Sequence, residues 1–237
     1  MKTFHLNAAP MSYARVAGLL YLVIIVCGIG GEGFIRAPLI NISDAAGTAA
    51  NLMAAPGVFR ASILADVVMA LSDVALAVLL FVLLRPVSYV LSLMAMAFRL
   101  VQAAILGFNL LNLHTAMALL DDSALVTGQR DALVTSFLGA HGAGYDIGLF
   151  FFGVNCLLVS ILLIRSGYFP RFLGWLILAA GVVYLVGSMV RIVSPALVNV
   201  VAPAYVVPLV AELAFCLWLA IKGLDASGWR TASQSAH

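Results

Sequence analysis

The stretch 98-FRLVQAAILGFNLLNLH-114 decides the fold, because it is an apolar helix of bilayer length that carries Arg99, Gln102, Asn109 and Asn112. A guanidinium in the middle of such a run is costly unless it is paired, so this helix predicts an interior polar site. The chain as a whole is 64% hydrophobic and 9% charged, with a mean hydropathy of +1.14. Soluble domains carry about 25% charged residues, and we therefore expect an integral membrane protein.

Composition also argues against several classes of function. The net charge is only +2, and the basic residues are scattered singly, which argues against nucleic-acid binding. Three cysteines, Cys27, Cys156 and Cys216, lie in apolar runs without CxxC spacing, so we interpret them as small buried hydrophobes. No nucleotide loop has the strand-turn-helix context it needs, and we expect no cofactor.

Six apolar runs are long enough to cross a bilayer, which predicts an all-α polytopic bundle. The first run, GLLYLVIIVCGIG, is closed by Glu32 and Arg36, and a mixed loop follows over 37–57, interpreted as a re-entrant or surface segment. A polar loop over 121–131 is expected to be the most solvated part of the chain. The remaining spans are predicted at 59–84, 87–113, 144–164, 172–193 and 203–221.

Lysine and arginine set the predicted orientation, because cytoplasmic loops are richer in both. With both termini inside, seven basic residues lie on the cytoplasmic side and four outside. The sequence therefore divides into a cytoplasmic segment over 1–12, a six-span domain over 13–222 and a cytoplasmic tail over 223–237, in the inner cell membrane. The inner set is Lys2, Arg15, Arg85, Arg165, Arg171, Lys222 and Arg230, and the outer set is Arg36, Arg60, Arg130 and Arg191.

Three carboxylates and one arginine fall at overlapping depths when each span rises by about 1.5 Å per residue. Asp66, Asp73, Glu212 and Arg99 would together cost on the order of 10 kcal/mol if all of them faced lipid. They are therefore predicted to face inward, with Arg99 as the only cation at mid-depth. With one positive charge for three acids, one carboxyl group is expected to be protonated or solvated and so to be a candidate proton donor.

Further polar residues extend this predicted site toward the outer face, as a funnel-shaped cavity. Asn155 and Tyr184 lie near mid-depth, and Glu32, His141 and Asp146 lie nearer the outer end. His114, His141 and an acid could together form a zinc site, since imidazole and carboxylate are zinc ligands. No HExxH or HxxxH motif supports such a site, and no metal is expected. The predicted catalytic residues are Asp66, Asp73 and Glu212, and the predicted ligand-binding residues are Arg99, Gln102, Asn109, Asn112, Tyr184, Asn155, Glu32, His141 and Asp146.

Several of these segments together resemble a bacterial integral membrane family, the one catalogued as domain of unknown function 4386. The resemblance extends from Tyr13 to Gly223 and implies a six-span membrane protein without an assigned activity. The segments are RVAGLLYLVIIVCGIGGEGFIR, FRASILADVVMALSDVALAVLLFVLLRPV, the 98–114 helix, HGAGYDIGLFFFG, RSGYFPRFLGWLILAAG and AELAFCLWLAIKG. By motif position it implies site roles for Glu32, Arg36, Asp66, Asp73, Arg99, Gln102, Asn109, Asn112, His141, Asp146 and Glu212.

Three functions remain open from the sequence. The first is binding or transport of a small amphipathic or lipid-like ligand in the outward-facing cavity, with Arg99 as counter-ion. The second is an intramembrane enzyme that uses the buried carboxylates as general acid or base on a lipid or isoprenoid. The third is a structural or regulatory subunit, in which the ion pairs only hold helices together. Membrane lipids are the expected partners, and the sequence predicts no oligomeric state.

Overall fold

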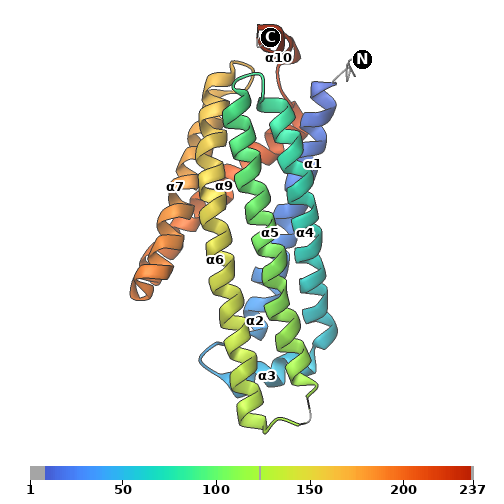
Figure 1. The fold of residues 1–237 in the computed structure, drawn as a ribbon, viewed down its shortest axis with the longest axis vertical. Helices are drawn as coiled ribbons and strands as arrows, with labels where there is room; N and C mark the ends of the chain where they lie inside the picture. Colours follow the sequence, from blue (N-terminus) through green and yellow to red (C-terminus); the bar gives the residue numbers. More distant parts are fainter. Residues whose placement is uncertain (1–8, 123, 236–237) are drawn as a thin grey trace. The chain divides into compact units, whose positions relative to one another are not determined.

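The structure, a computed structural model, describes residues 9–122 and 124–235. Within these residues the chain is almost entirely helical and contains no strand, as predicted (Figure 1). The short elements are the π-helical turns Ile29–Arg36 and Trp218–Lys222, the 3-10 turns Pro195–Leu197 and Ala202–Tyr205, and the helices α2 Ala37–Leu39, α3 Ala45–Ala54, α8 Val198–Val201 and α10 Ala226–Ser235. The long helices are α1 Pro10–Gly28, α4 Pro56–Leu84, α5 Tyr89–Leu120, α6 Thr127–Ser166, α7 Arg171–Val193 and α9 Val206–Leu217.

Six helical stretches in the described residues are long and apolar enough to cross a membrane. They are Pro10–Leu39, Pro56–Leu84, Tyr89–Leu120, Thr127–Ser166, Arg171–Val193 and Val198–Lys222. The predicted number of spans is confirmed. The first stretch does not end at Arg36, because the π-helical turn Ile29–Arg36 joins α1 to α2 without leaving helical backbone.

The chain forms two compact units. Unit 1 comprises residues 1–22, 73–100 and 150–237, and unit 2 comprises 23–72 and 101–149. Helices α1, α4, α5 and α6 each contribute one part to each unit. The two units are described separately below, since each has its own interior and its own buried charges.

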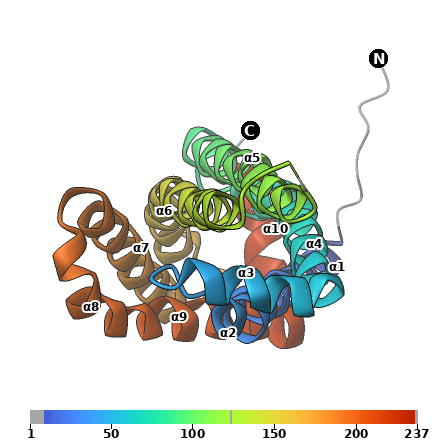
Figure 2. The same cartoon turned by 90° about the horizontal axis from the view of Figure 1, so that it is seen from below.

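Unit 2 contains α3, where the sequence predicted only a mixed loop. Asp44 caps this helix, because its Oδ1 accepts a hydrogen bond of 2.9 Å from the Gly47 amide. Figure 2 shows α3 beside α2, and the Thr48 hydroxyl donates a 2.8 Å hydrogen bond to the Asn41 carbonyl. Its apolar face is covered by a core that α4, α5 and α6 share. This core is made of Ala49, Leu52, Phe59, Leu113, Ala116, Met117, Leu120, Val134 and Leu138.

Helix α6 begins well before the predicted start of the fourth span at 144. Its first turns, from Thr127, include polar residues of the loop that was expected to be the most solvated. Asp131 in these turns is only 6% exposed and pairs with Arg130 at 3.0 Å. The prediction of a solvated loop to 131 is therefore wrong, because Val134 and Leu138 bury this part of α6 in the unit 2 core.

Unit 1 is held together by close helix contacts at small residues. The backbones of α6 and α7 approach at Gly153 and Gly181, where a Cβ added to Gly181 would lie 3.0 Å from the Gly153 carbonyl oxygen. Helix α1 approaches the turn after α9 at Gly18, and the Cys216 thiol donates to the Gly18 carbonyl at 3.4 Å. Such small-residue contacts are the usual way in which membrane helices pack, since lipid gives them no hydrophobic drive.

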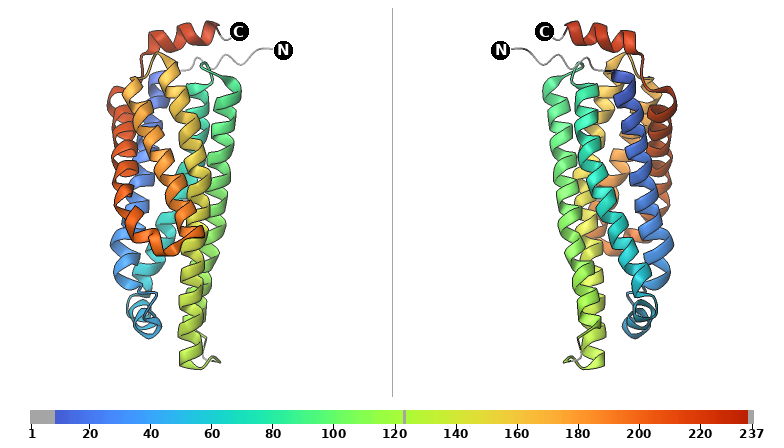
Figure 3. Two further views of the ribbon diagram at one scale, coloured as in Figure 1. Left: turned by 90° about the vertical axis from the view of Figure 1, so that its left-hand side faces the viewer. Right: turned by 90° about the vertical axis from the view of Figure 1, so that its right-hand side faces the viewer.

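The segment after 223, predicted to be a polar tail, contains a helix within unit 1. Asp225 starts α10, because its Oδ1 accepts a 3.0 Å hydrogen bond from the Ser227 amide. Figure 3 shows α10 lying crosswise at the ends of the long helices of this unit. Trp229 attaches it there, since the indole Nε1 donates a 3.0 Å hydrogen bond to the Leu83 carbonyl and the side chain is buried.

Candidate functional site

Unit 1 buries an ion pair between α4 and α5. Arg99 Nε donates a 2.8 Å hydrogen bond to Asp73 Oδ1, and both residues are 2% exposed. The rings of Tyr21 and Phe152 lie on the guanidinium, with their centroids 5.2 and 5.0 Å from its carbon. Carboxylate and aromatic contacts together replace the water that this cation lost on burial. Arg99 is thus enclosed by side chains of its own unit.

A second carboxyl group in unit 1 has a phenol as its hydrogen-bond partner. The Tyr184 hydroxyl on α7 donates to Glu212 on α9, and Glu212 is buried. The Tyr184 ring in turn packs on Phe152 and Tyr205, at centroid distances of 5.3 and 5.9 Å. The charge of Arg99 also acts on Glu212. Arg99 therefore interacts with two of the three carboxylates that the sequence assigned to it, Asp73 by a hydrogen bond and Glu212 through its charge.

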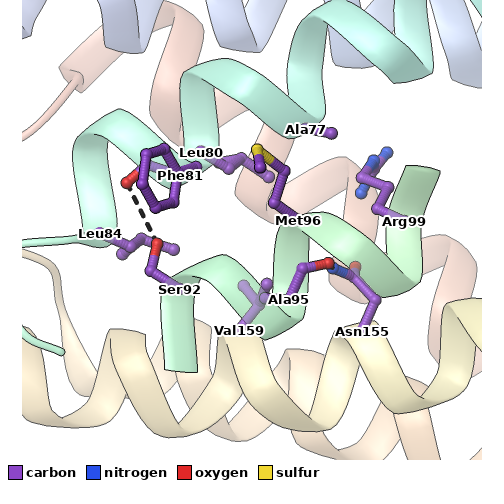
Figure 4. Close-up of a pocket in the computed structure, with 10 residues that line it drawn as sticks. All are labelled: Ala77, Leu80, Phe81, Leu84, Ser92, Ala95, Met96, Arg99, Asn155 and Val159. Carbon is purple, nitrogen blue, oxygen red and sulfur yellow. Dashed lines mark hydrogen bonds between the residues drawn. The ribbon is translucent and has the colours of Figure 1, made fainter. Parts of the chain in front are cut away.

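The cavity beside Arg99 is small. It measures ≈ 10 Å³ and is lined by apolar residues of α4, α5 and α6 together with Arg99, Ser92 and Asn155 (Figure 4). A volume of this size holds about one water molecule. The Asn155 amide already has a partner within the protein, because its Nδ2 donates a 2.7 Å hydrogen bond to the Ala95 carbonyl. In this conformation the cavity therefore has no room for a lipid-like ligand.

Unit 2 contains a second buried arginine. Arg36 is 1% exposed, and its Nη1 lies 2.7 Å from Asp66 Oδ2 and 3.2 Å from the Ser62 hydroxyl. Its Nε donates a 2.8 Å hydrogen bond to Glu32, whose side chain is 60% exposed. Two carboxylates therefore share one guanidinium in this unit, and one of the two carboxylates is open to the surroundings.

The prediction that Asp66 shares Arg99 as its cation is wrong. Asp66 has its own partner in Arg36, which the sequence placed at the end of the first span. The reason is the π-helical turn, which keeps the first span helical through Arg36 and buries the guanidinium next to α4. The spacing of Glu32 and Arg36, four residues apart on a helix, could have identified the Glu32–Arg36 ion pair. No sequence pattern pointed to Ser62 as a partner of Arg36.

His141 on α6 lies in a network of amides in unit 2. Asn109 Nδ2 donates to the His141 carbonyl at 2.7 Å and lies 3.1 Å from His141 Nδ1, whereas Asn112 Nδ2 donates to Asn109 Oδ1 at 2.9 Å. Nδ1 also lies 3.4 Å from the Asn109 carbonyl oxygen, so the tautomer decides whether Nδ1 accepts from the amide or donates to the carbonyl. The histidine is 6% exposed, so its Nε2 is a buried polar atom.

Besides Asp66 Oδ2, which lies 2.7 Å from Arg36 Nη1, three buried polar atoms of Arg36, Asp66 and His141 have no hydrogen-bond partner among the described residues. They are Arg36 Nη2, Asp66 Oδ1 and His141 Nε2. The charges of Arg36, Asp66 and Glu32 act on the His141 ring, and we refer to these four side chains as the cluster of unit 2. Leaving such atoms unpaired costs about 1–3 kcal/mol each, and native proteins leave them so mainly where water, an ion or a ligand binds.

The remaining predicted site residues have interactions of their own. Gln102 is buried and Asp146 is half-buried, and both have partners among the described residues. Residues 9–122 and 124–235 contain no group of three or more His, Cys, Asp or Glu side chains that could hold a metal ion. His114, the other histidine weighed for such a site, is exposed on α5.

Six apolar helices with charged pairs buried inside each unit define a multi-pass helical membrane protein. The chain belongs to the family described as "Domain of unknown function (DUF4386)", which it matches over residues 16–223. This confirms the resemblance found in the sequence. It is also 32% identical over 151 residues to an "Uncharacterized protein" of Archaeoglobus fulgidus, which covers 64% of this chain and 76% of the relative. No solved structure matches the chain.

These comparisons establish membership of a family and leave the activity open. Neither printed description names a ligand, a reaction or a partner. The relative is a protein of Archaeoglobus fulgidus, and these comparisons do not assign a bacterial source to this chain. The argument about function therefore rests on the chemistry of the two buried clusters.

Proposed function

We propose that this protein binds a small amphipathic ligand, and that the polar head of the ligand occupies the cluster of Glu32, Arg36, Asp66 and His141 in unit 2. The observation that carries the proposal is the set of three buried atoms without partners in that cluster. Arg36 Nη2 is a donor, Asp66 Oδ1 is an acceptor, and the tautomer of His141 decides whether its Nε2 donates or accepts. A head group that offers an oxygen acceptor beside a hydroxyl or amino donor would pair with all three.

The charge of the cluster narrows the class of ligand. One guanidinium and two carboxylates give a net charge of −1 with a neutral histidine, which favours a neutral, zwitterionic or cationic head over an anionic one. Glu32, the exposed member, is the residue that an entering ligand would meet first. The predicted orientation places Glu32 and His141 on the non-cytoplasmic side, so the ligand would enter from there.

The experiment is native mass spectrometry of protein purified in mild detergent from its own membranes. Wild-type protein is expected to retain a small molecule that denaturation releases for mass determination. His141→Asn and Glu32→Gln should lose it, whereas His114→Asn, an exposed histidine of α5, should retain it. Wild-type protein without such a molecule, or variants that all retain it, would contradict the proposal and leave ordered water as the partner of the three atoms.

A second candidate function, an intramembrane acid-base enzyme, is favoured by the Tyr184–Glu212 hydrogen bond in unit 1. A buried carboxylate that accepts a hydrogen bond from a phenol can act as a general base toward a substrate. The lipid profiles of cells that express wild-type protein or Glu212→Gln test this candidate. A lipid species made only with the wild type supports an enzyme, and identical profiles contradict it.

A further inference from the structure

The groove under α10 in unit 1 is a second place where this protein could hold a ligand. It has a volume of ≈ 720 Å³ and lies between α10, the turn after α4, the start of α5 and the end of α6. Two of its lining residues, Arg85 and Arg165, are basic, and none of the lining residues in the described chain is acidic. Serines 88, 166, 233 and 235 add hydroxyl groups to the same lining.

Neither guanidinium of this groove has a partner among residues 9–122 and 124–235. Arg85 and Arg165 are both exposed, and no ion pair or side-chain hydrogen bond engages them. The other lining residues in the described chain are neutral, so no negative charge in the lining offsets the two arginines. This differs from the smaller cavity of ≈ 470 Å³ beside Trp218, where Lys222 and Asp225 offset each other.

The position of the groove in the fold matches the surface of a bilayer. The two arginines follow the apolar parts of α4 and α6, and α10 lies crosswise at these helix ends (Figure 3). Trp229 fixes α10 there, because its Nε1 donates to the Leu83 carbonyl at 3.0 Å, and the Tyr168 hydroxyl, from the turn after α6, donates to the same carbonyl at 2.9 Å. Tryptophan and tyrosine at such a depth are typical of the level of lipid head groups.

We infer that this groove binds the phosphate of an anionic phospholipid, with Arg85 and Arg165 as its counter-ions. Paired arginines suit a phosphodiester because each guanidinium can donate two parallel hydrogen bonds to its oxygens. The start of α5 at Tyr89 adds backbone N–H groups and the positive end of a helix dipole at the same wall. The glycerol and acyl chains would remain in the bilayer beside α4 and α6. This site is independent of the ligand cluster in unit 2.

The test is a lipid titration of the full chain in detergent, followed by native mass spectrometry. Phosphatidylglycerol and phosphatidylcholine are the two probes, because they share acyl chains and differ in net charge. Juxtamembrane basic residues contribute about fivefold each to the binding of anionic lipid. Arg85→Gln/Arg165→Gln should therefore lower the preference for phosphatidylglycerol about 25-fold, by the same figure for two residues. Arg171→Gln/Arg230→Gln removes two exposed arginines outside the groove and should leave the preference for phosphatidylglycerol unchanged.

Two further measurements keep the inference testable if the glutamine pair folds poorly. Arg85→Lys/Arg165→Lys keeps both charges and should retain most of the preference. In wild-type protein the preference should weaken as salt rises and the Debye length falls below about 10 Å. A preference that salt does not change, or that both glutamine pairs lose equally, would overturn the inference. Competition by glycerol 3-phosphate as strong as that by the lipid would assign the groove to a soluble phosphate compound and would also overturn it.

Discussion

Each of the two units buries an arginine-aspartate pair, but the surroundings of the two pairs differ. In unit 1, Arg99 is bound by Asp73 and lies between two aromatic rings, next to a cavity of about one water molecule. In unit 2, Arg36 and Asp66 each keep an atom without a partner, and the pair is joined to the exposed Glu32. The Arg99–Asp73 pair is closed by aromatic rings, whereas the Arg36–Asp66 pair has more buried atoms without a hydrogen bond, and such atoms call for a partner such as water, an ion or a ligand.

The largest effect is expected when one member of the closed pair is removed. Arg99→Met leaves the buried Asp73 carboxylate without its cation, which costs about 3–5 kcal/mol in free energy of unfolding. Asp73→Asn/Arg99→Met removes both charges and should recover most of that loss. Unfolding in detergent, followed by circular dichroism, measures both. A double variant as unstable as the single one would show that the pair does more than balance charge.

A smaller loss is expected where α6 and α7 touch in unit 1. A side chain at Gly181 would press on the Gly153 carbonyl, on Leu157 and on Cys156, all within 3.1 Å of the new Cβ. Gly181→Leu should therefore lower the free energy of unfolding by about 1–3 kcal/mol. Gly107→Leu on α5 is the matched control, because no side chain lies within 4 Å of that position. Equal stability of the two variants would contradict the close approach of these helices.

Gly31→Ala in unit 2 should affect binding more than stability. The added methyl would lie 3.3 Å from Asp66 Oδ1, the acceptor without a partner, and 3.6 Å from Arg36 Nη1. We expect the retained ligand to be lost while the free energy of unfolding changes by less than about 1 kcal/mol. Gly30→Ala, with nothing within 4 Å, serves as its control and should keep the ligand. Retention of the ligand by Gly31→Ala would place the head group elsewhere.

The smallest effect concerns the capping of α10 by Asp225. The Ser227 hydroxyl and two backbone amides donate to this carboxylate and lower its pKa below the ordinary value. Because the pKa of Asp225 is lowered in the folded chain, its carboxylate stabilises α10 at pH values above the ordinary Asp pKa of about 3.9. This stabilisation is lost as the pH falls through the folded-state pKa. Hydrogen exchange of the α10 amides, corrected for intrinsic rates, should show protection at pH 7 that decreases below pH about 4. Asp225→Ala should lack this dependence, and a pH dependence that persists would contradict the cap.

The helices were predicted from the length of apolar runs. Helical segments that contain many polar residues were therefore missed. Six spans followed from hydropathy alone, because a bilayer admits few other structures. Helices α3 and α10 and the early turns of α6 are polar or mixed, and tertiary contacts such as those of Leu52, Trp229 and Val134 stabilise them. Such contacts are not visible in a hydropathy profile, so these segments were predicted as loops or as a tail.

The four charged residues predicted to face inward are buried, but the partner of Asp66 was not predicted. Asp73 with Arg99 and Glu212 with Tyr184 join residues that the depth argument had placed at similar levels. Asp66 was assigned to the wrong cation, because Arg36 was counted as the end of a span and so as solvent-exposed. Depth along a helix cannot say which face a residue occupies or where a π-helical turn shifts that face. The roles of these residues in binding or catalysis stay predictions.

The most direct test of the central claim compares the two buried pairs in one experiment. The small molecule retained by protein from its own membranes is measured by native mass spectrometry for wild type, His141→Asn and Asp73→Asn/Arg99→Met. The unit 2 site predicts that His141→Asn loses the molecule and that the unit 1 double variant keeps it. Loss from the double variant together with retention by His141→Asn would contradict the claim and place the ligand in unit 1.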